Sequence, residues 1–194
     1  MVGRFRHPER QGESEHAARA FEARGYEIRE LEDPASCLEG AGDALPFAGK
    51  LLAGYRIRSD FAAHTALARL LGVEVLSLAL VDQRFYPLDL SFCPLGDRRA
   101  IVAPHAWDAY GRKVVEHLVP EPLVLEPEEA LTFCANSVVV GTTIVMPACP
   151  PRVGRQLEAW GFDIVVCPVD EFLKAGGGVR CLTLALDVPL SCAA

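Results

Sequence analysis

A short pattern recurs along the 194-residue chain, and it constrains the fold more than any other feature of the sequence. In each copy, the end of an amphipathic helix is followed by a glycine and then by alternating apolar residues typical of a strand. The clear copies are Glu22–Ile28, Ala68–Val75 and Leu157–Ile164. A weaker copy, Tyr110–Leu125, passes from a helix through two prolines into an apolar run. A spacing in the mid-forties is typical of repeated supersecondary units such as propeller blades.

Two apolar runs around a glycine precede the helices, which predicts a hairpin before each helix. The predicted strands are Asp43–Ala48 and Lys50–Tyr55 around Gly49, and Phe133–Val140 and Thr143–Met146 around Gly141. The predicted helices are Glu13–Arg24, Asp60–Leu71, Ala106–His117 and Pro151–Trp160. The unit is thus strand, turn, strand, helix, strand. We expect about four units, the first incomplete because its hairpin would have to precede Met1. The same alternation could instead arise in a doubly wound α/β sheet.

Composition excludes several classes of function. A formal charge of −7 and a pI near 5.2 leave no basic run for a nucleic-acid partner. No apolar run approaches the roughly 18 residues of a membrane-spanning helix, and the N-terminus has no apolar core of a secretory signal. The seven cysteines are an odd count without a C-x-x-C pair, which indicates reduced thiols in a cytoplasmic protein.

The stretch Lys174–Leu184 is the strongest candidate for a functional loop. Three consecutive glycines run into a strand-like apolar segment, with Arg180 and Cys181 at the junction. Glycine allows close approach of a ligand, and a neighbouring guanidinium with backbone N–H groups would favour the nucleophilic thiolate. The alternative is a glycine-rich turn before a buried strand, in which Cys181 is only a small apolar residue.

Charged residues beside glycines and helix starts form a second group of candidates. Glu39 and Asp43 lie four residues apart around two glycines, where an ordinary turn would need no function. As a site, Glu39 could accept hydrogen bonds from a planar cationic substrate. Arg58 precedes the predicted helix cap at Asp60 and could bind a carboxylate at the helix N-terminus.

Asp89 and the histidines complete the candidates. We expect Asp89 to begin a buried strand, where a carboxylate needs a partner. The five histidines show no spacing typical of a metal site, and His16, His64 and His117 are interpreted as surface or helix residues.

Five segments, taken in order, carry a family resemblance. They are L-E-G-A-G-D-A-L (38–45), G-Y-R-I-R-S-D (54–60), R-F-Y-P-L-D-L-S-F-C-P-L (84–95), F-C-A-N-S-V-V-V-G (133–141) and E-F-L-K-A-G-G-G-V-R-C-L-T-L (171–184). From about Arg4 to Leu190 the chain resembles the amidinotransferase and dimethylarginine dimethylaminohydrolase group, to which arginine deiminase is related. The resemblance implies an α/β pentein propeller of five ββαβ units around a central cavity.

The resemblance also implies roles for individual residues. Cys181 would attack the guanidinium carbon, Glu39 and Asp89 would hold the guanidinium nitrogens, and Arg58 would face the amino acid's carboxylate. Asp43, Gly177 and Gly178 would complete the substrate-binding set. The implied reaction cleaves a C–N bond of arginine or a methylated arginine through a covalent cysteine intermediate and gives citrulline. It needs a small guanidino substrate, but no metal or other cofactor.

Two departures from the family pattern keep other functions open. The family usually has a histidine acid–base where this chain has Pro87, and His64 and His105 are the available substitutes. The chain also begins after the segment that forms the family's first blade. We therefore expect residues 1–194 to form a single, N-terminally shortened domain with about four of five units, which would favour self-association into a homo-oligomer. The alternatives are amidino transfer to an amine acceptor and a pentein that binds without catalysis.

Overall fold

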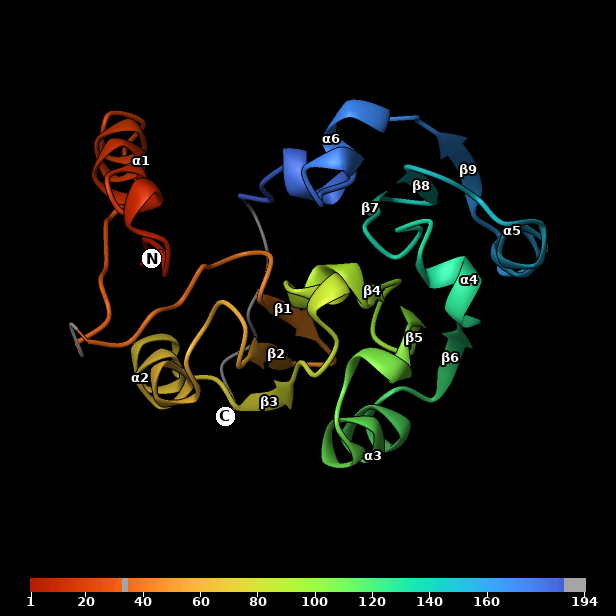
Figure 1. The fold of residues 1–194 in the computed structure, drawn as a ribbon, viewed down its shortest axis with the longest axis horizontal. Helices are drawn as coiled ribbons and strands as arrows, with labels where there is room; N and C mark the ends of the chain where they lie inside the picture. Colours follow the sequence, from red (N-terminus) through yellow and green to blue (C-terminus); the bar gives the residue numbers. More distant parts are fainter. Residues whose placement is uncertain (33–34, 187–194) are drawn as a thin grey trace.

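The computed structural model describes residues 1–32 and 35–186 and has an α/β architecture (Figure 1). Its strands form three separate three-stranded sheets, each built from consecutive strands. The first sheet contains β1 (Ala44–Phe47), β2 (Lys50–Tyr55) and β3 (Val75–Ala79). The second contains β4 (Phe92–Pro94), β5 (Arg99–Val102) and β6 (Glu121–Val124). The third contains β7 (Val138–Val140), β8 (Thr143–Met146) and β9 (Asp163–Val166).

Each sheet repeats one pattern of connections. Its first two strands form an antiparallel hairpin, and its third strand pairs in parallel with the second. A parallel pair needs a long crossover, because the chain must return to the same end of the sheet. Helices α2 (Phe61–Leu71), α3 (Ala109–Leu118) and α5 (Pro151–Ala159) make these crossovers. The predicted order of strand, turn, strand, helix, strand is therefore confirmed for three units.

The three units follow one another along an arc, with the strands on its inner side and helices α2, α3 and α5 on its outer side (Figure 1). The remaining helices are α1 (Glu13–Glu22), α4 (Pro127–Ala130) and α6 (Asp170–Lys174). The 3₁₀ helices are η1 (Pro8–Arg10), η2 (Gln83–Phe85), η3 (Leu88–Leu90), η4 (Pro104–Ala106) and η5 (Arg180–Leu182). No helix within 1–32 or 35–186 is long and apolar enough to cross a membrane.

Glycines end two crossover helices as the repeat predicts. Gly72 follows α2 with a left-handed φ of 66°, and its N–H donates to the carbonyl of Ala68 at 2.9 Å. Gly161 lies just after α5 with a φ of 88°, and its N–H donates to the carbonyl of Glu158 at 2.9 Å. A residue without a side chain adopts this backbone angle at little cost, so the chain can turn from helix to strand.

The strand predicted after the glycine of the N-terminal copy does not form. Gly25 does end α1 with a φ of 85°, but residues 26–32 form no strand. The N–H of Val2 donates to the carbonyl of Arg29 at 3.0 Å, and Arg4 forms an isolated antiparallel bridge with Leu38. No described hairpin lies beside this segment to continue a sheet, so its alternating residues remain irregular.

Two other predicted elements begin several residues later than predicted. The helix predicted from Ala106 begins at Ala109, because the Asp108 side chain accepts the N–H of Gly111 at 2.7 Å and caps it there. The strand predicted from Phe133 begins at Val138, because Phe133 has a φ of 57° and residues 133–137 form a turn. Within that turn the Ser137 hydroxyl donates to the carbonyl of Cys134 at 2.7 Å.

One large core connects the three units. It contains inward side chains of every sheet, among them Phe47, Phe92, Trp107 and Ile144. The rings of Phe47 and Phe92 meet edge to face at 5.5 Å, and the indole N–H of Trp107 donates to the hydroxyl of Ser91 at 2.9 Å. Continuous burial across the units fixes their positions relative to one another.

His64 links α2 to the first sheet. Its side chain is buried, and its ring nitrogens contact the hydroxyl of Ser77 at 2.7 Å and the carbonyl of Gly54 at 3.2 Å. Burial lowers its pKa to about 4, with the Gly54 carbonyl opposing the change. The prediction that His64 is a helix residue is confirmed, but the histidine faces the sheet and not the surface.

We predict that His64 makes the fold acid-sensitive. Its pKa is lower in the folded than in the unfolded state, so its contribution to stability is present above about pH 6.5 and is lost as the pH falls toward 4. At roughly 1.4 kcal/mol for each pKa unit, the loss is on the order of 3 kcal/mol. Urea unfolding of the natural chain and of His64→Gln at pH 7.5 and 4.5 should show a smaller loss in the variant. An equal loss in the two proteins would contradict the prediction.

Candidate active site

Cys181 lies on the 3₁₀ turn η5, and the residue as a whole is exposed. Its sulfur, however, lies against the buried side chains of Asn136 and Asp89. The segment after the glycines was predicted to be a strand, but it forms this turn and then irregular chain up to residue 186. A Cβ atom on Gly177 would lie 3.1 Å from the Cβ and 3.4 Å from the Sγ of Cys181. A side chain at this position would therefore press on the thiol, which explains the glycine.

Asn136 holds the cysteine loop in place. Its carboxamide Oδ1 accepts the N–H of Gly178 at 2.9 Å and the N–H of Cys181 at 3.3 Å. Its Nδ2 donates to the Sγ of Cys181 at 3.2 Å and to the carbonyl of Asp89 at 3.4 Å. The residue is fully buried, and a Cβ on Gly178 would lie only 2.8 Å from Oδ1. One amide side chain thus contacts the loop, the thiol and the neighbouring acid.

Asp89 faces the thiol from the second unit. It lies in η3 before β4, and not at the start of a strand as predicted, because its N–H donates to the carbonyl of Gly42 at 2.9 Å. Its side chain is 2% exposed, and its Oδ2 lies 3.8 Å from the Sγ of Cys181 and 4.0 Å from Nε of Arg180. Within residues 1–32 and 35–186, its Oδ1 is buried without a hydrogen-bond partner. A buried carboxylate oxygen left unsatisfied is costly, and it marks a position where a donor can bind.

Burial raises the pKa of Asp89 to about 7. The guanidinium of Arg180 opposes this change, and the nearby carboxyl of Asp43 adds to it. Near neutral pH and with no ligand present, the acid therefore binds a proton much more readily than an ordinary aspartate does.

The expectation of a thiolate at Cys181 is wrong for the empty site. Loss of water around the sulfur raises the pKa of Cys181, and the carboxyl of Asp89 raises it further. The hydrogen bonds from Asn136 and Gly178 oppose this rise. Arg180, which was expected to favour the thiolate, has its guanidinium beside Asp89.

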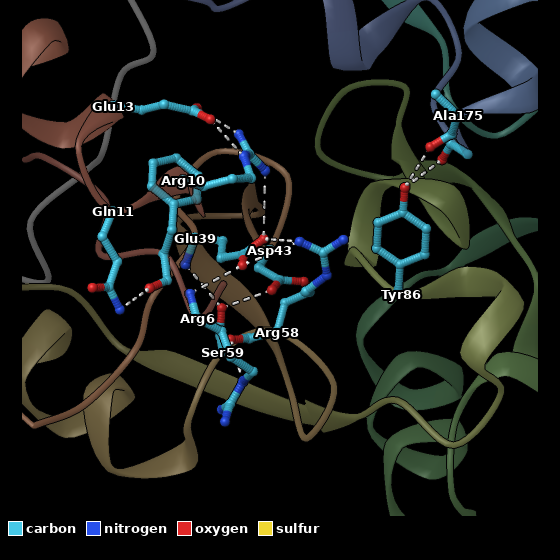
Figure 2. Close-up of polar contacts among 12 residues, drawn as sticks. Arg6, Arg10, Gln11, Glu13, Glu39, Asp43, Arg58, Ser59, Tyr86 and Ala175 are labelled. Atoms are coloured by element: carbon cyan, nitrogen blue, oxygen red, sulfur yellow. Dashed lines mark hydrogen bonds and ion pairs between the residues drawn. The ribbon is translucent and has the colours of Figure 1, made fainter. Parts of the chain in front are cut away.

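Glu39 and Arg58 form an ion pair beside this group (Figure 2). Nη1 of Arg58 donates to both Glu39 oxygens, at 3.2 and 3.0 Å, and the side chains are 19% and 12% exposed. The N–H of Arg6 also donates to Glu39 at 3.3 Å, and Nη1 of Arg10 lies 4.0 Å away. The carboxylate predicted to hold a substrate guanidinium therefore holds a guanidinium of the chain itself.

Asp43 has protein partners for both of its oxygens. It is buried at the start of β1, and it accepts the Ser59 hydroxyl at 2.7 Å and the N–H of Leu88 at 3.0 Å. Burial raises its pKa to about 6, and these two hydrogen bonds oppose the rise. Asp43 therefore connects β1 to the segments that carry Arg58 and Asp89.

Tyr86 joins the two halves of the site (Figure 2). The guanidinium carbon of Arg58 lies 4.7 Å from the centre of the Tyr86 ring. The Tyr86 hydroxyl donates to the carbonyls of Ala175 and Gly176, at 3.2 and 3.0 Å. Gly176 has a φ of 85°, and a Cβ there would lie 2.6 Å from the hydroxyl. The first glycine of the triplet therefore allows Tyr86 to reach the cysteine loop.

Pro87 lies beside Asp89 at the same short turn. A Cβ on Gly42 would be 3.4 Å from both the Cβ of Pro87 and the Oδ2 of Asp89. The two histidines considered as substitutes lie elsewhere: His64 under the first sheet and His105 against the ring of Phe85 at 5.1 Å. Within residues 1–32 and 35–186, no hydrogen bond or ion pair joins a histidine to Cys181 or Asp89.

Sequence reasoning missed Asn136 and Tyr86. Both lie in segments that carry the family resemblance, but neither was assigned a role. The available signal for Asn136 is a carboxamide in an otherwise apolar run, since such a residue is seldom buried without partners. Across the described residues, no group of three or more histidine, cysteine or acidic side chains could hold a metal ion.

Known proteins resemble this chain over almost all of its length, although no family model matches it. It is 40% identical, over 98% of its residues, to the bifunctional arginine dihydrolase/ornithine cyclodeaminase AgrE of Nostoc sp.. It is 37% identical, over 96% of its residues, to the N(G),N(G)-dimethylarginine dimethylaminohydrolase of Mycobacterium tuberculosis. The chain spans 28% of the first relative's length and 61% of the second's.

A solved structure shows the same similarity. The product-bound N-terminal domain of ArgZ, an arginine dihydrolase from cyanobacteria, superposes with a TM-score of 0.93 at 40% identity. The match covers 97% of this chain and 70% of that domain. A variant of that domain has been solved covalently bonded to a reaction intermediate. At this identity and coverage, the chain belongs to the amidinotransferase and dimethylarginine dimethylaminohydrolase family and has its α/β pentein fold.

Proposed function

We propose that this chain hydrolyses a guanidino C–N bond of arginine or a methylated arginine through a covalent intermediate on Cys181. One observation carries the proposal: the Sγ of Cys181 lies 3.8 Å from a buried carboxyl oxygen of Asp89, which faces it across the site. A planar cation on that carboxylate would have its central carbon beside the sulfur, in a geometry suited to attack. The solved relatives that bind arginine or its products support this substrate class.

The substrate's positive charge explains how the thiol becomes nucleophilic. In the empty site, burial and Asp89 hold the pKa of Cys181 above its ordinary value. A guanidinium bound against both groups would neutralise the carboxylate and favour the thiolate. The thiolate would then add to the guanidinium carbon, an amine would leave, and water would release citrulline and the free cysteine.

The remaining site residues would bind and orient the substrate. Glu39 would transfer its hydrogen bonds from Arg58 to the substrate guanidinium, and the freed Arg58 would bind the α-carboxylate. Asp43 would hold the segments that carry Arg58 and Asp89 in position, through its hydrogen bonds with Ser59 and Leu88. Gly177 and Gly178 would allow the reacting carbon to approach the sulfur.

We also propose a domain organisation, an oligomeric state and a location for this chain. We expect residues 1–194 to act as one domain that represents about four of the five units of a pentein propeller. Apolar side chains at the ends of the third sheet, such as Val140 and Val166, are exposed. They support association into a homo-oligomer. The reduced cysteines of the described residues support a cytoplasmic location.

Two alternatives make different predictions. An amidinotransferase would pass the amidino group to an amine, so its turnover would require an acceptor such as glycine. A non-catalytic pentein is favoured by Pro87, which cannot carry a proton. If citrulline forms only in Pro87→His, the natural chain has a degenerate site.

We predict that the natural chain releases citrulline from arginine or from dimethylarginine without an added amine. Cys181→Ser should lose at least about 10⁴-fold in turnover, because the hydroxyl is a far weaker nucleophile. The matched control is Cys167→Ser, which alters another exposed free cysteine and should keep the natural rate. Citrulline release that survives in Cys181→Ser would refute the role of Cys181.

We also predict that Asn136→Ala weakens catalysis by roughly 10- to 100-fold, since a hydrogen bond to a charged group contributes about 1.5–3 kcal/mol. The substitution removes the donor to sulfur and the acceptor for two loop N–H groups, so the pKa of Cys181 should rise. Alkylation of Cys181 by iodoacetamide across pH 6–10 measures that pKa. Asn136→Asp keeps an oxygen that accepts the two loop N–H groups but loses the N–H that donates to the sulfur. Comparing the two variants therefore distinguishes loss of loop order from loss of the contact with the thiol. An unchanged titration in both variants would rule out this role.

A further inference from the structure

We propose that Asp89 is the proton-transfer residue of this site, taking the Cys181 proton during attack and giving it to the leaving amine. The proposal rests on the function proposed above. It starts from two observations: Oδ2 of Asp89 lies 3.8 Å from the sulfur, and Oδ1 is buried with no hydrogen-bond partner among the described residues. One oxygen therefore faces the thiol, while the other lacks a donor that a reacting nitrogen could supply.

The other groups around the thiol cannot carry this proton. Asn136 and Pro87 do not titrate, and the guanidinium of Arg180 has hydrogen-bond donors but no acceptor for a proton. The oxygens of Asp43 are occupied by Ser59 and Leu88. By exclusion among the described neighbours, Asp89 is the titratable group in contact with sulfur.

Glu39 and Tyr86 are also unsuited to the task. Glu39 accepts two hydrogen bonds from Arg58, and the Tyr86 hydroxyl donates to the backbone of the cysteine loop. Burial raises the pKa of Tyr86 above its ordinary value, so its phenolate is disfavoured near neutral pH. Both side chains are committed to holding the site together.

The electrostatic surroundings of Asp89 suit an acid–base. Its pKa of about 7 lies near neutrality, where one group can both accept and donate a proton at useful rates. Burial and Asp43 raise this pKa, and Arg180, Cys181 and Asn136 lower it. An isolated surface aspartate, with a pKa near 4, would be a poor donor to an amine.

Asp89 shuttles one proton in each half of the reaction. Its carboxylate takes the thiol proton as sulfur bonds to the guanidinium carbon, which gives a neutral tetrahedral adduct and a protonated acid. The acid returns this proton to the departing nitrogen, the C–N bond breaks, ammonia or an amine is released, and a cationic thiouronium remains. Asp89 then takes a proton from water as the water oxygen bonds to carbon. The C–S bond breaks, the new hydroxyl passes its proton to sulfur, and citrulline leaves. Asp89 gives its remaining proton to the released ammonia or amine, which departs as a cation and restores the carboxylate.

A leaving-group test separates proton transfer from substrate binding. Asp89→Asn should lower kcat by about 10²- to 10⁴-fold on arginine, whose leaving nitrogen needs a proton. With S-methylthiocitrulline, whose methanethiol leaves as a much weaker base, the loss should be at least about tenfold smaller than on arginine, because only the proton transfer to the leaving group is no longer needed. Equal losses on both substrates would show that Asp89 only binds the cation and would overturn the proposal.

A second measurement needs no turnover, so it distinguishes failure of this proposal from failure of the proposed function. Chloroacetamidine is a cationic amidine that alkylates a thiol in one step. In the natural chain its rate at Cys181 should level off near pH 7, where Asp89 becomes the carboxylate that accepts the proton. In Asp89→Asn the rate should keep rising above pH 8. A natural profile without the inflection near pH 7, or a variant that retains it, would refute the role of Asp89 even in an inactive protein.

Controls address folding and specificity. Asp163→Asn makes the same change at an exposed strand residue and should keep both natural profiles. Circular dichroism checks that Asp89→Asn is folded. If it is not, Asp89→Ala with added formate is the second test, because formate can take the place of the missing carboxylate. Recovery of alkylation at pH 7 by formate, but not by chloride, supports the proposal, and no recovery in folded protein contradicts it.

Discussion

The hydrogen bonds of the Asn136 carboxamide are the contacts on which the rest of the site depends. They join the turn before β7, the cysteine loop and the turn that carries Asp89. These three segments lie far apart in the sequence, and each is irregular, so the sheets alone do not fix their mutual positions. A fully buried amide with donors and acceptors on both sides fixes them at low conformational cost, since the short side chain has few rotamers to lose.

Charge is the second organising constraint. Three acids lie close to one another. The carboxylate of Glu39 raises the pKa of Asp43, and the carboxyl of Asp43 raises the pKa of Asp89. Arg58 and Arg180 offset this concentration of negative charge in the empty site. Under the proposed function, an incoming guanidinium would have the shape and charge of these internal partners, so it would replace Arg58 on Glu39 without leaving that carboxylate unpaired. The same cation would change the protonation of the thiol, which would link substrate recognition to chemical activation.

Much of the fold was predictable from local patterns. The alternation of apolar residues and the stops at Gly72 and Gly161 are sufficient to place the first and third crossover units, because each pattern is satisfied within one hairpin and one helix. The second unit was indicated only by its helix and by the apolar run that follows it. The same logic failed after Gly25, where no neighbouring hairpin is described that could pair with a strand. It also failed at Asp89 and Cys181, which lie in 3₁₀ turns fixed by the distant partners Gly42 and Asn136.

The site was predictable only in part for a related physical reason. Residue type and family resemblance identified Cys181, Glu39, Asp89 and Arg58, which lie together. They could not show that Glu39 is paired with Arg58, or that the thiol has a raised pKa, because both depend on distances between units.

The most direct test of the central claim is the mass of the protein during turnover. The natural chain is mixed with arginine, quenched with acid within milliseconds to seconds, and digested for peptide mapping by mass spectrometry. The proposal predicts that the peptide containing Cys181 gains the mass of arginine less ammonia, and that the gain decays as citrulline accumulates. Citrulline formation without an adduct, or an adduct on another cysteine, would contradict a covalent mechanism at Cys181.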